Sequence, residues 1–200
     1  MEDELIDKCS SLKLEDDEEN VIDLGNMESG KAEGNLELLV VGRLCMARPY
    51  NVEAFKRTML KVWAPVEGMV IRVLSPNLYG FQFFHWRDKE KVMKGRPWCW
   101  DNHLLVLNEV GGDEQPDLVN LKHSPFWLRI FKLPFNCRSN EYIEALVSGL
   151  GELLEIEEDT LGLNRYRRVR LMLDVTRPLR RYQRIKSRGG NEFKVEFKYE

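Results

Sequence analysis

Cysteine pairs, long apolar runs and an export signal are all missing from this 200-residue sequence. The four cysteines lie far apart with no C-x-x-C pair, which argues against a disulfide framework and against a zinc site within the chain. The longest apolar runs, residues 38–41 and 104–107, are far shorter than the roughly 20 residues that cross a membrane. The N-terminus is acidic where a secretory signal is basic. We therefore expect an intracellular protein, in the nucleus or the cytoplasm, with no membrane partner.

The motifs of the common enzyme classes are also absent. There is no P-loop, no G-x-S-x-G and no glycine-rich dinucleotide turn. The histidines, His85, His103 and His123, are 18 and 20 residues apart, without the i, i+4 spacing of metal ligands on a helix. The acidic cluster at residues 152–159 is more typical of a solvated helix end than of a cation site. We predict that the chain is not an enzyme.

Charge is plentiful but unevenly distributed, because an acidic head precedes a basic tail. Residues 1–37 hold 13 acidic side chains against three lysines, whereas 12 of the 34 residues from 165 to 198 are Arg or Lys. The net charge of −3 for the whole chain hides this asymmetry, which is typical of proteins with a polyanionic partner. The head also has too little apolar surface to offset the entropy of ordering. We therefore expect residues 1–37 to be mostly disordered.

Residues 38–112 predict a βαββαβ order of elements. Asn51 caps the first helix and Asp88 caps the second, which stops at Gly95 and Pro97. The four predicted strands are residues 38–44, 69–74, 78–86 and 104–110. This order is that of the ferredoxin-like sandwich, and it makes the domain similar to the RNA-recognition motif.

A smaller βαββ unit is predicted for residues 113–200. Residues 126–133 form its first strand, and Ser139 caps its helix. The last two strands, 169–175 and 193–199, alternate apolar and charged residues with period two, and the turn Gly189-Gly190-Asn191 lies between them. The predicted fold class is therefore α+β, with a ferredoxin-like domain followed by a smaller unit.

The aromatic run that begins at Tyr79 lies on the third predicted strand, where RNA-recognition motifs carry the rings that stack on bases. If Tyr79 and Phe81 face solvent, the amide of Gln82 is buried, which costs about 1–3 kcal/mol when it lacks partners. The shifted register buries Tyr79, Phe81 and Phe83 and exposes Gln82. We favour the shifted register, in which the first domain has the fold of that motif without its stacking platform.

The basic tail is the better candidate for a nucleic-acid site. Arginine outnumbers lysine nine to three between residues 165 and 198, and arginine is suited to bidentate phosphate contacts. One aromatic ring lies among the loop arginines, where it can stack on a base. The alternative is a solvated hairpin face whose charges only keep the protein soluble. The candidate residues are Arg168, Arg170, Arg177, Arg180, Arg181, Tyr182, Arg184, Lys186, Arg188, Lys194 and Lys198.

Short strings spread over the chain are similar to one known family. They include Gly42-Arg43-Leu44, Phe81-x-Phe83-Phe84, Pro97-Trp98, Phe126-Trp127-Leu128 and the terminal Phe197-Lys198-Tyr199-Glu200. Together they resemble the plant domain of unknown function 4283 over roughly residues 36–200. The resemblance implies a likeness to the Gag-like first open reading frame of plant LINE-type retrotransposons, and it implies no catalytic residues.

The resemblance also implies a zinc knuckle of the CX2CX4HX4C type directly after the terminal tyrosine-glutamate pair. We expect this knuckle to be absent from the chain, so that there is no cofactor here and zinc enters only if a knuckle lies further downstream.

These observations together favour a nucleic-acid-binding, Gag-like module. We expect it to bind RNA or single-stranded DNA through the basic hairpin, and we count a second copy of the chain as a further candidate partner. The alternative is a protein–protein scaffold or self-association module, in which the acidic head folds back on the basic tail and no nucleic acid is bound.

Overall fold

The computed structural model describes residue 21 and residues 30–111, 114–160, 163–187 and 189–200. The chain divides into two compact units, Met1–Lys31 and Ala32–Glu200, and the second unit holds both sheets. The predicted disorder of residues 1–37 falls largely outside the described residues. It is wrong for the last part of that range, because Gly30–Glu37 forms helix α2. The end of this helix is held by a side chain from later in the chain. The carbonyl of Glu37 accepts a hydrogen bond from Lys89 Nζ at 2.5 Å.

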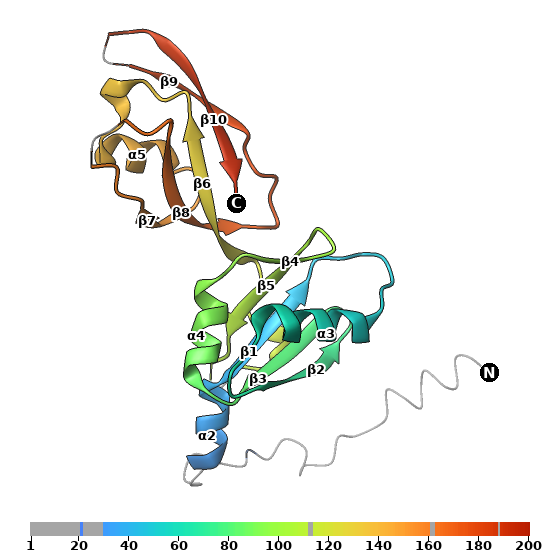
Figure 1. The fold of residues 1–200 in the computed structure, drawn as a ribbon. Coiled ribbons are helices and arrows are strands. Elements are labelled where there is room, and N and C mark those ends of the chain that lie inside the picture. The colour runs from blue at the N-terminus through green and yellow to red at the C-terminus, as the bar shows by residue number, and fades with distance from the viewer. Residues whose placement is uncertain (1–20, 22–29, 112–113, 161–162, 188) are drawn as a thin grey trace, which may run out of the picture. The chain divides into compact units, whose positions relative to one another are not determined.

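The first sheet is antiparallel and has the strand order β2-β3-β1-β5-β4 (Figure 1). Its elements are β1 (Leu39–Leu44), α3 (Val52–Trp63), β2 (Met69–Ser75), β3 (Leu78–Phe83), α4 (Trp86–Lys94), β4 (Trp98–Trp100) and β5 (His103–Glu109). Without β4, this is the predicted βαββαβ order with the ferredoxin-like arrangement of strands. The predicted fold class is therefore confirmed, and β4 is an addition that pairs with β5 as a hairpin.

The second sheet is also antiparallel and has the order β7-β8-β6-β10-β9. Its elements are β6 (His123–Phe131), α5 (Asn140–Val147), β7 (Glu152–Ile156), β8 (Tyr166–Asp174), β9 (Tyr182–Lys186) and β10 (Glu192–Tyr199). The 3₁₀ turns η1 (Pro116–Leu118) and η2 (Phe135–Cys137) precede β6 and α5. The predicted strand–helix–strand–strand unit corresponds to β6, α5, β8 and β10. Strand β7 lies in the acidic cluster at residues 152–159, which we expected to be a solvated helix end. Strand β9 lies between the two last predicted strands, where no strand was predicted.

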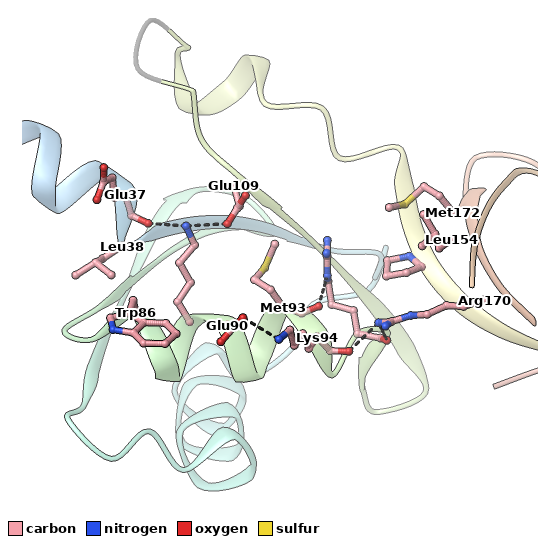
Figure 2. A pocket seen from close by; sticks show the side chains of 13 residues that line it. Glu37, Leu38, Trp86, Glu90, Met93, Lys94, Glu109, Leu154, Arg170 and Met172 are labelled. Carbon is pink, nitrogen blue, oxygen red and sulfur yellow. Dashed lines mark hydrogen bonds and ion pairs between the residues drawn. The ribbon is translucent and has the colours of Figure 1, made fainter. Parts of the chain in front are cut away.

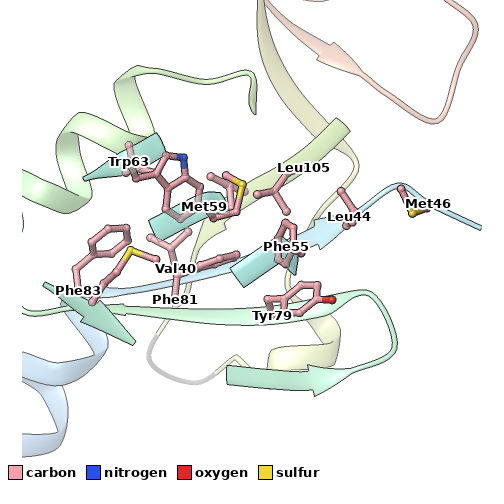
Figure 3. Close-up of a cluster of buried hydrophobic side chains, with 13 residues drawn as sticks. Val40, Leu44, Met46, Phe55, Met59, Trp63, Tyr79, Phe81, Phe83 and Leu105 are labelled. Carbon is pink, nitrogen blue, oxygen red and sulfur yellow. The ribbon is translucent and has the colours of Figure 1, made fainter. Parts of the chain in front are cut away.

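Helices α3 and α4 cover one face of the first sheet and share its core with β1, β3 and β5 (Figure 3). Asn51 caps α3 as predicted, because its Oδ1 accepts a hydrogen bond from the amide three residues later at 2.9 Å. The buried face of α3 presents Phe55, Met59 and Trp63, and α4 contributes Val92 to the same cluster. Amphipathic spacing on both helices therefore places them on the same side of the sheet.

The predicted cap of α4 is wrong. His85 is the N-cap, and its Nδ1 accepts a hydrogen bond from the amide of Arg87 at 3.1 Å. Asp88 lies in the first turn, where its carboxylate accepts hydrogen bonds from the amides of Val66 and Glu67 at 3.0 and 2.9 Å. The carboxylate therefore fixes the loop that follows α3 instead of the end of its own helix.

The favoured register of the aromatic strand is confirmed. Tyr79, Phe81 and Phe83 are at most 1% exposed and lie in the first core (Figure 3). Gln82 points to the opposite face, where its Nε2 donates to the carbonyl of Asn35 at 2.9 Å. The first sheet therefore has no row of exposed rings on β3.

The opposite face of the first sheet is covered at its centre by the segment that leads to β6. Val41 and Val106 are fully buried in one cluster with Val119 and Leu121 of that segment. The face that RNA-recognition motifs use for stacking is thus closed here by apolar packing.

The second core lies between α5 and one face of the second sheet. Ile143 and Val147 of α5 are fully buried against Val169 and Leu171 of β8 and Leu128 of β6. Alternation along the strands places the remaining residues of β6, β8 and β10 on the other face, which we call the outer face.

Candidate nucleic-acid interface

The outer face of the second sheet carries alternating aromatic and basic side chains. On β6, the buried Leu128 and Ile130 point to the core, and Trp127, Arg129 and Phe131 point outward because successive side chains alternate. All three outward side chains are half-buried. The strand at the centre of the sheet therefore presents two rings that flank one guanidinium group.

The neighbouring strand β8 continues this pattern across the sheet. Residues directly opposite each other on antiparallel strands share a face. The outward pairs are Trp127 with Arg170, Arg129 with Arg168, and Phe131 with Tyr166. The Phe131 and Tyr166 rings are in contact, with centroids 5.2 Å apart. Rings and guanidinium groups thus form a continuous surface over the two central strands.

A basic side chain lies over each of four aromatic rings on this face. The distances from Arg Cζ or Lys Nζ to the ring centroid are 4.2 Å for Arg168 over Trp127, 4.8 Å for Arg129 over Tyr166, 5.1 Å for Lys198 over Phe131 and 4.3 Å for Lys194 over Tyr182. Such a contact contributes about 0.5–1 kcal/mol at an exposed site, which applies to Lys194 over Tyr182, and about 2 kcal/mol where the groups are desolvated. The exposed contact is weak enough for a stacking base to replace the cation.

Carboxylates neutralise part of the positive charge of this face. Glu200 forms ion pairs with both Arg129 and Arg168, and Glu157 pairs with Arg168 at 3.0 Å. Burial lowers the pKa of Arg168, but its hydrogen bonds with Glu157 and Glu200 outweigh burial and raise that pKa above its ordinary value. The charges of the two central arginines are therefore partly neutralised by carboxylates, whereas Lys194 and Lys198 are exposed.

The predicted site residue Arg170 is committed to backbone contacts. Its Nη2 donates to the carbonyl oxygens of Lys94 and Arg96 at 2.7 and 3.3 Å. It lines a cavity of about 520 Å³ within residues 32–200, and the ion pair of Lys94 with Glu90 lies at the same cavity (Figure 2). Arg170 therefore stabilises the packing around this cavity.

The other predicted residues are exposed along the connection from β8 to β10. Arg177 forms an ion pair with Asp174 at 3.0 Å. Arg184 of β9 lies directly opposite Lys194 of β10 in the strand register. Arg180, Arg181 and Lys186 are exposed as well. Arg188 lies outside the described residues. The structure thus brings Arg168, Tyr182, Arg184, Lys194 and Lys198 to one face, and it places the loop arginines 177, 180 and 181 beyond the end of β8.

The sequence reasoning missed the centre of this surface. Trp127, Arg129, Phe131 and Tyr166 were not among the candidate residues. The alternation of apolar and other residues along 126–131 contains the signal, because Leu128 and Ile130 fix which side chains point outward. The pairing with β8 that joins the rings to Arg168 depends on tertiary structure.

Neither a membrane helix nor a metal cluster occurs among the described residues. No helix in that part of the chain is long and apolar enough to cross a membrane. In the same ranges, no three His, Cys, Asp or Glu side chains are grouped so that they can hold a metal ion.

A family model matches the first sheet and its helices. Residues 32–117 match the Domain of unknown function (DUF4283). The resemblance that the short strings implied is thus confirmed for this part of the chain.

A second family model, described as a zinc knuckle, matches residues 173–200. This match overturns our expectations that the knuckle is absent and that the chain has no cofactor. The matched residues themselves do not fit a zinc ion, because none of them is cysteine or histidine, the residues that hold zinc in such knuckles. They form the end of β8, β9 and β10 of the second sheet.

No curated protein matches the chain. Among solved structures, the chain is similar to the RNA recognition domains 1 and 2 of Sex-lethal from Drosophila melanogaster, with 12% identity over 68% of this chain and 85% of that chain and a TM-score of 0.30. Because this TM-score is low, the fold class rests on the strand order of the two sheets.

Proposed function

We propose that the chain is a binding module, not an enzyme, and that the outer face of its second sheet binds single-stranded nucleic acid, either RNA or DNA. The observation that carries this proposal is the set of four aromatic rings on one face, each covered by an arginine or a lysine. Aromatic rings interleaved with cations are the arrangement with which proteins bind single strands, since every base can stack and every nucleotide brings a phosphate.

The proposed mechanism is an exchange of partners on the outer face. A base stacks on a ring and displaces the cation from it, and that cation then pairs with a phosphate. Stacking contributes about 1–3 kcal/mol per base, which exceeds the value of the exposed cation–π contact that it replaces. At Arg129 and Arg168 a phosphate must also compete with Glu200, so Lys194 and Lys198 are the first cations available to the ligand.

The basic hairpin that the sequence predicts as the binding site also contributes to this proposed surface. Tyr182, Arg184 and Lys194 belong to the β9–β10 hairpin and extend the outer face toward its edge. The loop arginines 177, 180 and 181 remain predicted phosphate contacts. A Gag-like module of retrotransposon origin, which the family resemblance implied, would use such a surface for sequence-independent binding.

Replacement of Tyr182 by alanine tests the proposal. The ring is 51% exposed, so its loss has little effect on the core. We expect Tyr182→Ala to weaken binding of a 12-residue single-stranded RNA by about tenfold, in fluorescence anisotropy, because one stacking contact is lost. Phe135→Ala is the matched control, since Phe135 is also exposed and covered by an arginine but follows β6 outside the sheet. Equal affinities of wild type and Tyr182→Ala would favour the scaffold alternative.

A further inference from the structure

The outer face of the second sheet leads into the cavity of about 520 Å³ that Arg170 lines. Its outward cross-strand pairs include Trp127 with Arg170, and the next outward pair in the register is Pro125 with Met172. Pro125, Arg170 and Met172 all line the cavity. The Cζ atom of Arg170 also lies 5.8 Å from the centroid of the Trp127 ring. The rows of rings and cations on the outer face therefore end at this cavity.

The cavity has apolar surface that the fold leaves uncovered. Trp86 of α4 and Leu154 of β7 line it, and they are 55% and 43% exposed. The guanidinium group of Arg87 lies over the Trp86 ring, with its Cζ atom 5.4 Å from the centroid. A ring with a cation over it is the arrangement of the outer face, and a base can stack on such a ring. The volume lies within the range of about 300–1,000 Å³ that is typical of small-ligand sites.

Two guanidinium groups at the cavity have no acidic partner. Arg170 donates through Nη2 to backbone carbonyls, and its Nε is buried without a hydrogen-bond partner. Arg96 donates to the carbonyls of Met93 and Leu107 at 2.7 and 3.0 Å. In the described ranges, neither arginine forms an ion pair with a carboxylate. Burial and the charge of Arg170 lower the pKa of Arg96, and the charge of Glu109 opposes this shift. An anion in contact with both arginines would bind to their free N–H groups and offset their repulsion.

The carboxylates that line the cavity do not neutralise these arginines. Glu90 and Glu109 each form an ion pair with a lysine at 2.8 Å. Glu37 is the third carboxylate, and Figure 2 shows it on the side of Trp86, at the end of the cavity opposite Arg170. A phosphate is therefore favoured at the arginine end, and an uncharged ring is favoured at the Trp86 end.

We infer that the cavity binds one nucleotide, with its phosphate at Arg96 and Arg170 and its base stacked on Trp86. The nucleotide is either part of the strand on the outer face or a free mononucleotide, because both bring the same phosphate and base. In the first case the inference rests on the proposed function, and the strand passes from Trp127 over Arg170 into the cavity.

Calorimetric titration of the full chain with adenosine 5′-monophosphate tests the inference. We expect saturable binding, and about tenfold weaker binding of adenosine, because adenosine lacks the phosphate. Leu154→Glu places a carboxylate at the cavity without emptying a core position, so it should weaken binding of the monophosphate by about tenfold. Leu118→Glu makes the same charge change at an exposed position outside the cavity and should bind like wild type.

A second pair of variants tests the stacking contact. Trp86→Ala should weaken binding of the monophosphate by about tenfold, because the base loses its ring. Phe84→Ala is the matched control, since Phe84 is 56% exposed and does not line the cavity. Equal losses in the two variants would contradict stacking on Trp86.

Titration with single-stranded RNA separates the two sources of the nucleotide. Leu154→Glu should weaken RNA binding more than Leu118→Glu does if a nucleotide of the strand enters the cavity, whereas equal RNA affinities would assign the cavity to a free mononucleotide. Tyr182→Ala should leave binding of the monophosphate unchanged, so a failure of the outer face and a failure of the cavity are distinguishable. No saturable binding of the monophosphate, equal binding of adenosine, or unchanged binding by Leu154→Glu would overturn the inference.

Discussion

At the scale of single residues, Glu200 explains how two arginines stand opposite each other. Arg129 and Arg168 are directly paired across β6 and β8, and like charges in that position are destabilising. The carboxylate of Glu200 pairs with both, and Glu157 adds a second contact to Arg168. The same contacts compete with any phosphate that approaches the centre of the outer face.

Removal of the Glu200 carboxylate should therefore strengthen nucleic-acid binding. We expect Glu200→Gln to raise the affinity for single-stranded RNA about threefold at low salt, since one further phosphate contact steepens the dependence of log affinity on log salt by about 0.7. Titrations at several salt concentrations measure both quantities. Glu67→Gln in the loop after α3 is the control, because Glu67 is exposed, lies outside the second sheet and forms no side-chain ion pair among the described residues. A loss of affinity on Glu200→Gln would show that Glu200 supports the site.

At the scale of elements, the three strands that the sequence did not predict all lie at sheet edges, whereas the edge strand β2 was predicted. Strands β4, β7 and β9 are short, and β9 reads as Tyr-Gln-Arg-Ile-Lys, so local pattern and length do not separate it from a loop. Each is a strand because a neighbour supplies hydrogen bonds. The central strands were predictable, since apolar side chains alternate along them. Which outward side chains meet was not, because this depends on pairing register.

The loop after α3 gives a prediction about pH at this scale. Hydrogen bonds from the amides of Val66 and Glu67 hold the pKa of the Asp88 carboxyl below its ordinary value, against the opposing effect of burial. A carboxyl whose pKa is lower in the folded state stabilises the protein above its unfolded pKa of about 3.9, and this contribution is lost as pH falls through the folded pKa.

We therefore expect Asp88→Asn to lower the free energy of unfolding by about 1 kcal/mol at pH 7, because two charge-assisted hydrogen bonds weaken. Denaturant titrations should show this difference shrinking as the pH is lowered below about 4. A difference that stays constant from pH 7 to pH 3 would contradict the role given to the ionised carboxylate.

At the scale of the whole molecule, two sheets of the same strand order have different surfaces. In the first sheet, the face opposite the helices is covered by Val119 and Leu121. In the second sheet, the corresponding outer face presents rings and cations. The first sheet therefore serves as a scaffold in this account, and the second carries the binding surface. The acidic head carries charge opposite to that surface, and we therefore expect it to compete with phosphates at high effective concentration.

Deletion of residues 1–29, which leaves α2 intact, should tighten binding of single-stranded RNA at low salt by a few fold. The gain should disappear at high salt, because screening weakens the competition between the head and the phosphates. Anisotropy titrations of both chains at two salt concentrations measure this. Identical affinities at low salt would exclude autoinhibition by the head.

The salt dependence of single-stranded RNA binding tests the central claim most directly. Lys194 and Lys198 are exposed on the outer face, and each neutralised phosphate contributes about 0.7 to the slope of log affinity against log salt. The account predicts that Lys194→Ala with Lys198→Ala flattens this slope by about 1.4, whereas Arg57→Ala with Lys61→Ala, an equal loss of charge on exposed positions of α3, leaves it unchanged. Equal slopes for wild type and the Lys194/Lys198 variant would contradict binding on this face.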